Sequence, residues 1–141
     1  MATSLTFTGT LMQSASLLLS SSQLTPVVIA QGGANGSRIY SIAVQTNSTT
    51  APTLIMNMSG SFGIARMSAV SITAFSGYNA GIATFDYFGN STPAAVFQKN
   101  KDANGVPYFN LAPNTVLTVN TSASFITTGA TASIFVNGEF Y

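Results

Sequence analysis

Residues Ala30–Gln45 read AQGGANGSRIYSIAVQ, a glycine-rich segment that runs directly into a segment of alternating apolar and polar residues. The Asn-Gly pair at 35–36 is typical of tight turns between strands, because such turns need positive φ values. Period-two alternation predicts a strand over Ser37–Thr46 with one buried face. That alternation assigns Tyr40, Ile42 and Val44 to the buried face, and Ser41, Ala43 and Gln45 to the opposite face.

The same glycines raise the question of a phosphate-binding loop. A dinucleotide fingerprint needs G-x-G-x-x-G between a strand and a helix, and a P-loop needs Gly-Lys followed by Ser or Thr. Neither spacing is present, and the pattern after the glycines is that of a strand. We therefore predict a plain inter-strand turn. Arg38, at the join, is expected to hydrogen-bond turn carbonyls or a neighbouring chain.

Short apolar runs separated by Gly, Asn, Ser and Pro continue along the chain, which is the pattern of many short strands. Further strands are predicted at Thr3–Thr8, Thr25–Ala30, Thr53–Met58, Ala69–Phe75, Ile82–Phe88, Thr115–Thr121 and Thr131–Tyr141. About eight strands without a dependable helix predict an all-β fold, an antiparallel β-sandwich of jelly-roll type. An immunoglobulin-like sandwich is the main alternative.

The chain divides into an N-terminal segment and one domain. Residues 1–24 have no regular pattern and are predicted to form an arm or a short helix or strand, while residues 25–141 form the sandwich. Asn90–Pro107 is the longest segment predicted to be irregular. In the last predicted strand, the alternation turns Phe135 and Tyr141 outward.

Composition excludes several classes of function. The chain has no Cys, no His and no Trp, its net charge is +1, and only 5% of its residues are charged, against about 25% in typical proteins. There is no thiolate for a metal, no imidazole for general-base catalysis, and no basic stripe for nucleic acid. No apolar run is long enough for a transmembrane helix. We therefore expect no cofactor, no metal, no nucleic acid and no membrane.

The three carboxylates do not suggest an active site. Asp86, Asp102 and Glu139 are far apart in the sequence, and nothing in their spacing pairs them as glycoside hydrolysis requires. A Ser–Lys dyad would need Lys99 or Lys101 to be buried, yet both lie in a polar stretch with the turn signal KDANG. We predict that the protein is not an enzyme.

Aromatic residues at turns and on outward faces are the best functional indication. Partly exposed aromatics and arginines often anchor protein interfaces, and aromatics sometimes bind sugars. The alternative is that these rings only cover the open ends of the sandwich. The candidate interface residues are Arg38, Tyr78, Tyr87, Tyr108, Phe135 and Tyr141.

Three segments carry a resemblance to a known class of proteins. They are GANGSRIYSIAVQTNSTTAPTLIMNM, VPYFNLAPNTVLTV and the closing TTGATASIFVNGEFY. Together they resemble small structural proteins of tailed bacteriophages, over about residues 27–141. The resemblance implies a virion component, assembled in the host cytoplasm, most simply a capsid decoration (cement) protein that bridges capsid subunits. Its implied partners are the major capsid protein and copies of itself, in a homotrimer or larger oligomer.

A second function is compatible with the same resemblance. A tail-fibre or receptor-binding module would recognise a host-surface glycan through exposed aromatics such as Tyr78, Tyr87 or Tyr108. A sugar site is expected to combine Asp, Asn and an aromatic, and Asp86–Tyr87 with Asn90 is the one such cluster in the sequence.

Overall fold

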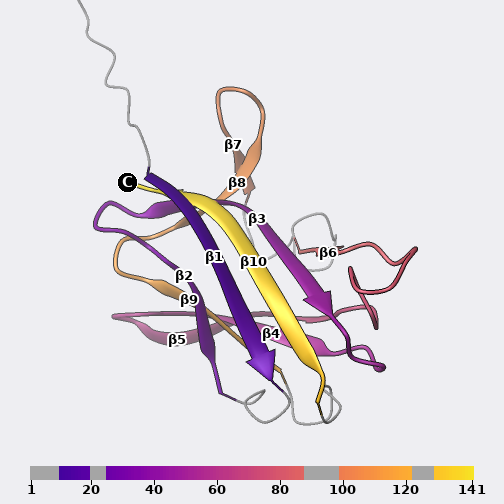
Figure 1. The fold of residues 1–141 in the computed structure, drawn as a ribbon. Coiled ribbons are helices and arrows are strands. Elements are labelled where there is room, and N and C mark those ends of the chain that lie inside the picture. Colours follow the sequence, from indigo (N-terminus) through magenta and orange to yellow (C-terminus); the bar gives the residue numbers. More distant parts are fainter. Residues whose placement is uncertain (1–9, 20–24, 88–98, 122–128) are drawn as a thin grey trace, which may run out of the picture.

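Strands that follow one another in the sequence are distributed over two antiparallel sheets, packed face to face (Figure 1). The computed structural model describes residues 10–19, 25–87, 99–121 and 129–141, and within these it contains ten strands and no helix. The predicted all-β sandwich is therefore confirmed. None of the described segments forms a helix that could cross a lipid bilayer.

The larger sheet has six strands in the order β1-β10-β3-β8-β7, and β6 pairs with the far end of β3. Residues Ser37–Ile39 of β3 pair with β8, while Ala43 and Val44 pair with β6, so two short strands share one edge of a long one. The bounds of these strands are β1 Thr10–Leu19, β3 Ser37–Thr46, β6 Phe85–Asp86, β7 Lys99–Lys101, β8 Pro107–Leu111 and β10 Thr131–Phe140.

The smaller sheet has four strands in the order β2-β9-β4-β5. β4 and β5 form a hairpin that closes with Gly60 opposite Gly63, where the sequence predicted a turn. The bounds are β2 Val27–Gln31, β4 Thr53–Gly60, β5 Gly63–Ser71 and β9 Val116–Thr121.

The connectivity is that of a jelly roll. The chain passes from β1 in the larger sheet to β2 in the smaller one, returns for β3, and crosses again for β4 and β5. It crosses back for β6 to β8, then forms β9 in the smaller sheet and β10 in the larger one. As a result, β1-β10-β3-β8 lies against β2-β9-β4-β5, which is the double-sheet arrangement expected from the sequence.

Both sheets contribute alternate side chains to one core. In β9 and in the first half of β10, every second residue is buried, as period-two alternation predicts. The largest fully buried side chains are Ile29, Ile39, Ile42, Leu54, Met56, Ile72, Tyr87, Leu111, Leu117 and Ile134. Burial of this apolar surface is the main favourable term in folding.

Tyr40 does not belong to this core, although the alternation assigned it there. Ser41 pairs with Asn137 and Ile39 pairs with Gly138, so Tyr40 is an extra residue that forms a β-bulge. The bulge places Ile39 and Ile42 in the core, three positions apart, and leaves Tyr40 half-buried on the outer face. The prediction for Tyr40 is therefore wrong, while those for Ile42 and Val44 are confirmed.

The glycine-rich turn has no free amides for a phosphate. Its N–H groups donate to acceptors within the protein, and Ser37 Oγ also donates to the Gln31 carbonyl over 2.8 Å. The donor and acceptor pairs are Gly32 with Thr115 O, Gly33 with Ser37 Oγ, Asn35 with Tyr141 O, and Gly36 with Gly33 O. Of the Asn-Gly pair, only Gly36 has a positive φ, of 90°. The inter-strand turn is confirmed.

The N-terminal segment contributes a strand to the sandwich. Thr10–Leu19 pairs along its whole length with β10 and forms an edge of the larger sheet. Of the forms predicted for residues 1–24, the strand is thus the one observed in this part. The strand predicted at Thr3–Thr8 lies outside the described residues.

Two other segments differ from the prediction. β5 begins at Gly63 and ends at Ser71, so it lies several residues before the predicted Ala69–Phe75. Pro107–Leu111 and Lys99–Lys101 form a hairpin at the end of a stretch predicted to be irregular. Asp102 closes this hairpin, because its Oδ1 accepts from the N–H groups of Asn104 and Val106 over 2.9 and 2.8 Å. The turn signal KDANG is therefore confirmed.

Candidate interaction surface

Five side chains from three neighbouring strands gather on the outer face of the larger sheet. Arg38 pairs with Glu139 of β10 on one side and with Asn110 of β8 on the other. The two neighbours of Arg38 in β3 are buried, so its own side chain points outward. We use the name Arg38 cluster for Arg38, Tyr40, Tyr108, Glu139 and Tyr141, all of which are half-buried.

Arg38 lies between two aromatic rings. Its Cζ is 4.5 Å from the centroid of the Tyr108 ring and 5.0 Å from that of the Tyr141 ring. Both distances lie within the range of cation–π attraction. Tyr40 contacts Tyr108 edge-on, with 6.0 Å between ring centroids. The expected contact of Arg38 with turn carbonyls is therefore replaced by contacts with tyrosine rings.

Glu139 connects the tyrosines of the cluster. Its Oε2 accepts from the hydroxyl of Tyr141 over 2.5 Å and from that of Tyr40 over 3.4 Å. Burial raises the pKa of the Tyr141 hydroxyl well above its usual range, and the hydrogen bond to Glu139 raises it further, while Arg38 opposes the shift. The cluster thus joins one cation, one carboxylate and three phenol rings.

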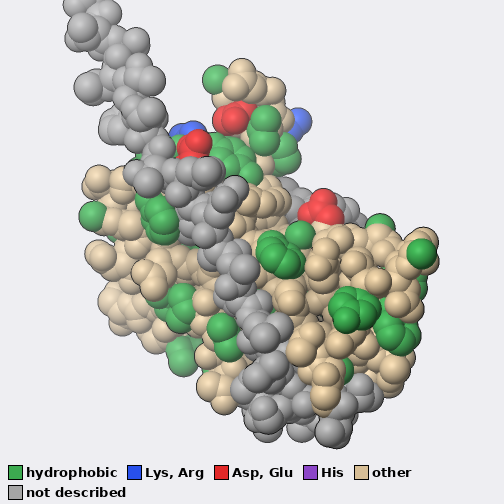
Figure 2. Space-filling view, in the orientation of Figure 1, with side chains coloured by type: hydrophobic (Ala, Val, Ile, Leu, Met, Phe, Trp, Pro, Cys, Tyr) green, Lys and Arg blue, Asp and Glu red, His purple; other side chains and the backbone are tan. Residues whose placement is uncertain are grey.

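Charged side chains of the larger sheet gather at one end of the molecule. In Figure 2 they lie mainly around the β7–β8 hairpin and the nearby end of β10, whereas most of the rest of this view is uncharged polar and hydrophobic. In a chain with only 5% charged residues, this concentration makes the Arg38 cluster chemically distinct from its surroundings.

Three of the six candidate interface residues thus come together: Arg38, Tyr108 and Tyr141. Two others are exposed but lie elsewhere. Phe135 is 38% exposed on the outer face of β10, and Tyr78 is 65% exposed in the loop after β5.

Tyr87 was predicted to be exposed, and that prediction is wrong. Its side chain is fully buried, and its ring packs edge-on against Phe85 with centroids 6.2 Å apart. Its hydroxyl hydrogen-bonds Ser68 of β5, so the residue connects the two sheets. Burial raises the pKa of Tyr87, and the hydrogen bond with Ser68 partly opposes this. Tyr87 is a core residue, which removes it from the candidate interface and from the candidate sugar site.

Tyr40 and Glu139 are the members of the cluster that sequence reasoning missed. Tyr40 was assigned to the core because the bulge was not anticipated. The signal that could have found it is the apolar spacing Ile39–Ile42–Val44, since a three-residue step inside a period-two strand indicates one extra residue.

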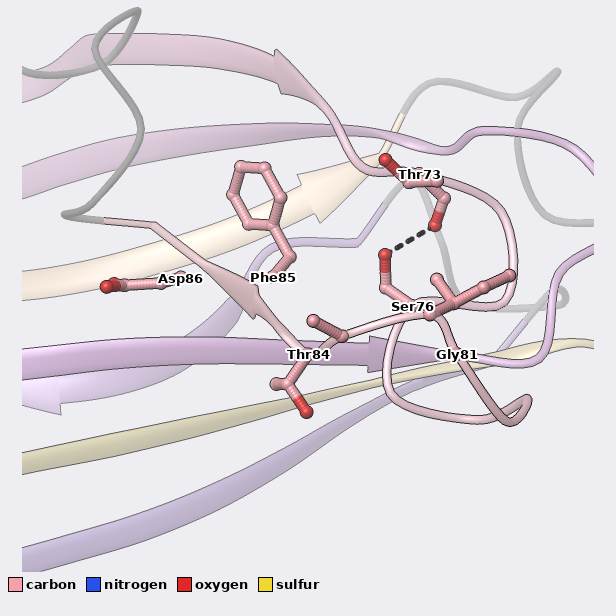
Figure 3. A pocket seen from close by; sticks show the side chains of 8 residues that line it. Thr73, Ser76, Gly81, Thr84, Phe85 and Asp86 are labelled. Atoms are coloured by element: carbon pink, nitrogen blue, oxygen red, sulfur yellow. Dashed lines mark hydrogen bonds between the residues drawn. The ribbon is translucent and has the colours of Figure 1, made fainter.

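An open depression of about 450 Å³ lies beside β6 (Figure 3). Hydroxyl groups, the ring of Phe85 and the carboxylate Asp86 line it. Two of the hydroxyls already have partners, since Ser76 Oγ donates to Thr73 O over 2.7 Å and Thr84 Oγ1 accepts from Gln45 Nε2 over 3.4 Å. Asn90, the third member of the candidate sugar cluster, lies outside the described residues.

The three carboxylates lie on separate elements. Asp86 is on β6, Asp102 holds the β7–β8 turn, and Glu139 accepts from tyrosine hydroxyls. Within the described ranges, no three acidic, histidine or cysteine side chains gather as metal ligands do. The expectations of no metal, no nucleic acid and no enzymatic activity stay predictions.

No protein-family model matches the chain, and neither the curated proteins nor the solved structures contain a significant match to it. Arguments about function therefore rest on the described surfaces and on the resemblance noted from the sequence.

Proposed function

We propose that this protein is a structural subunit of a bacteriophage particle, and most specifically a capsid decoration protein. It would bind across joints between capsid subunits and raise the stability of the head by covering their exposed surface. The major capsid protein would be its partner, and the assembled virion its location.

The Arg38 cluster is the observation that supports this proposal. Tyrosine and arginine are enriched among the residues that contribute most to protein–protein affinity. Arg38 stacks with its planar face against Tyr108 and Tyr141, and this leaves the edge of the guanidinium available to a partner. The cluster is half-buried and already ordered by its internal contacts, so binding would cost little side-chain entropy.

The scaffold also suits a long-lived assembly. All five residues of the cluster lie on or next to strands β3, β8 and β10, which are paired with one another. Contact residues on paired strands keep a fixed spacing, which a repeating lattice of binding sites requires. Three of the candidate residues were selected from the sequence for this role, together with the resemblance to phage structural proteins.

Binding to heads tests the proposal directly. Purified protein would be titrated onto heads of its own phage that lack it, with bound protein measured by co-sedimentation and head stability by calorimetry. We expect saturable binding and a rise in the melting temperature of the head. Arg38→Ala should weaken binding by about tenfold, since a contact of this kind contributes more than about 1 kcal/mol.

Lys101→Ala is the matched control, because it also removes one positive charge. Lys101 is exposed on β7 and is not a member of the cluster. We expect binding of this variant to be close to that of the unmodified protein. Absence of binding, or an unchanged melting temperature of the head, would contradict the decoration function.

The depression beside β6 favours a second candidate, a receptor-binding module that recognises a glycan. Neutral hydroxyls, one aromatic ring and a carboxylate are groups that can bind a sugar. Screening the protein on a glycan array, with Thr84→Arg as the variant that fills the depression, tests this function. Binding that Thr84→Arg abolishes would favour it, and a blank array would count against it.

A further inference from the structure

The outer face of the smaller sheet is nearly free of charge. We call it the neutral face and define it by the outward positions of β2, β9, β4 and β5. Those positions are Val28, Gln31, Val116, Thr118, Asn120, Thr53, Ile55, Asn57, Ser59, Ile64, Arg66, Ala69 and Ser71. Arg66 is the one charged residue among them.

Strand register arranges these residues in rows across the sheet. One row joins Val28, Thr118, Asn57 and Arg66. The next row joins Gln31, Val116, Ser59 and Ile64, and a third joins Asn120, Ile55 and Ala69. Aliphatic side chains therefore alternate with hydroxyls and carboxamides over the whole face.

Two of the aliphatic side chains are well exposed. Ile64 is 77% exposed and Val28 is 45% exposed, while Phe62 at the tip of the β4–β5 hairpin is 59% exposed. Exposed apolar groups on a continuous, uncharged sheet face favour association, because burial of apolar area is favourable and little charge must be desolvated.

The chemistry of the face matches that of a second copy of itself. Hydroxyl and carboxamide groups both donate and accept hydrogen bonds, so a face built from Thr, Ser and Asn is complementary to its own copy. A strongly charged partner would bury charges against groups that cannot neutralise them, which is costly. A partner of equally low charge is therefore required, and another molecule of this chain provides one.

Arg66 does not prevent this pairing, because it lies on β5, at the edge of the face. A two-fold axis parallel to the strands places β4 of one copy over β9 of the other, and β5 over β2. The two Arg66 side chains then lie on opposite edges, where their charged ends reach water. Two sheets packed in this way cross at about 30°, the angle that sheet twist favours.

The area of the face suits a moderate affinity. Four strands spaced about 4.8 Å apart and about seven residues long cover roughly 19 by 23 Å. The two copies together would bury about 900 Å², near the lower limit of about 1,000 Å² for specific interfaces. An association of this size is expected to be reversible on dilution.

We propose that the neutral face is the surface through which two copies of this protein associate. This deepens the proposed function, since it leaves the Arg38 cluster on the opposite sheet free for the capsid. A decoration subunit that pairs in this way could connect neighbouring capsid sites.

Sedimentation equilibrium of the purified chain tests the inference without any phage component. We expect a mass of twice 14.6 kDa at high protein concentration, with dissociation on dilution. Thr118→Lys introduces a charge at the centre of the face, and Ser133→Lys makes the same change at a half-buried position on the outer face of β10. Circular dichroism would confirm that both variants are folded.

Thr118→Lys should weaken association by at least tenfold, whereas Ser133→Lys should leave it unchanged. Ile55→Lys is a second variant of the face and should behave like Thr118→Lys. A monomer at every concentration, association that Thr118→Lys and Ile55→Lys leave intact, or equal loss in folded Ser133→Lys would each overturn the inference. None of these outcomes affects binding of the monomer to heads, so failure here is distinguishable from failure of the decoration function.

Discussion

Arg38 and Glu139 are register partners across β3 and β10, and Tyr141 contacts both of them. The ring of Tyr141 lies 5.0 Å from the guanidinium of Arg38, while its hydroxyl donates to Glu139 over 2.5 Å. The main chain of Tyr141 is also fixed, because its N–H donates to the Gly36 carbonyl over 3.1 Å. One residue therefore connects the outer-face cluster to the glycine-rich turn.

Arg38→Ala is expected to lower the free energy of unfolding by about 1–2 kcal/mol, because it removes two cation–π contacts of about 0.5–1 kcal/mol each. Arg38→Lys should lose less, since a lysine keeps the charge but cannot stack as a plane. Urea unfolding followed by circular dichroism measures the effect. If Arg38→Ala unfolds at the same urea concentration as the exposed-site control Lys101→Ala, the stabilising role of the cluster is refuted.

Stability is expected to fall at alkaline pH. Tyr87 and Tyr141 have raised pKa values in the folded protein, mainly through burial, whereas tyrosines of the unfolded chain titrate near about 10. The contribution of both residues is therefore complete below about pH 10 and is lost as the pH rises beyond it. Urea midpoints at a series of pH values from 8 upward measure this loss.

Tyr141→Phe provides the control for the alkaline effect. This variant lacks the hydroxyl that donates to Glu139, so its stability should decline less steeply above about pH 10. Absorbance at the phenolate band should show that some of the five tyrosines ionise only when the protein unfolds. Free titration of all five in the native protein would disprove the prediction.

Tyr87→Ala should destabilise the protein by about 3–5 kcal/mol, the range for removal of a large buried aromatic side chain. Tyr87→Phe keeps the ring and loses the hydrogen bond with Ser68, and should cost about 1 kcal/mol. Tyr78→Ala, at a residue 65% exposed, should change stability by less than about 0.5 kcal/mol. Thermal unfolding would compare the three, and equal melting temperatures would contradict the burial of Tyr87.

Gly36→Ala is expected to destabilise the protein more than Gly105→Ala. Both glycines have positive φ values, of 90° and 79°, so both substitutions cost about 1–2 kcal/mol of backbone strain. A Cβ at position 36 would also lie 2.9 Å from the Leu111 carbonyl oxygen, whereas one at position 105 meets nothing within 4 Å. The difference between their urea midpoints isolates the steric part, and an equal loss would contradict the close packing of the turn.

The long core strands were predictable because one face of each is buried along most of its length. β3 and β10 occupy nearly the predicted ranges, and the inward residues Ala132, Ile134 and Val136 follow from simple alternation. Two buried faces of opposite sheets require a sandwich, so the fold class also followed from the pattern.

Tyr40 and Tyr87 show where local patterns fail. A bulge depends on how β3 pairs with β10, about 100 residues further along the chain, and the sequence around Tyr40 carries only the faint sign of a three-residue apolar step. Tyr87 follows an exposed aspartate, yet its burial depends on Ser68 from the other sheet. Contacts between distant strands decided both positions, and they determined the Arg38 cluster as well.

The position of β10 between β1 and β3 has a consequence for how the protein folds. The larger sheet cannot be completed until residues 131–140 have been synthesised, because they provide the hydrogen-bonding partners of Thr10–Leu19 and Ser37–Thr46. Before that, β3 and β1 have unpaired edges that can bind other strands. Closing such long loops is slow, so folding over milliseconds to seconds is expected. The nascent chain is therefore most exposed to aggregation just before its last strand is available.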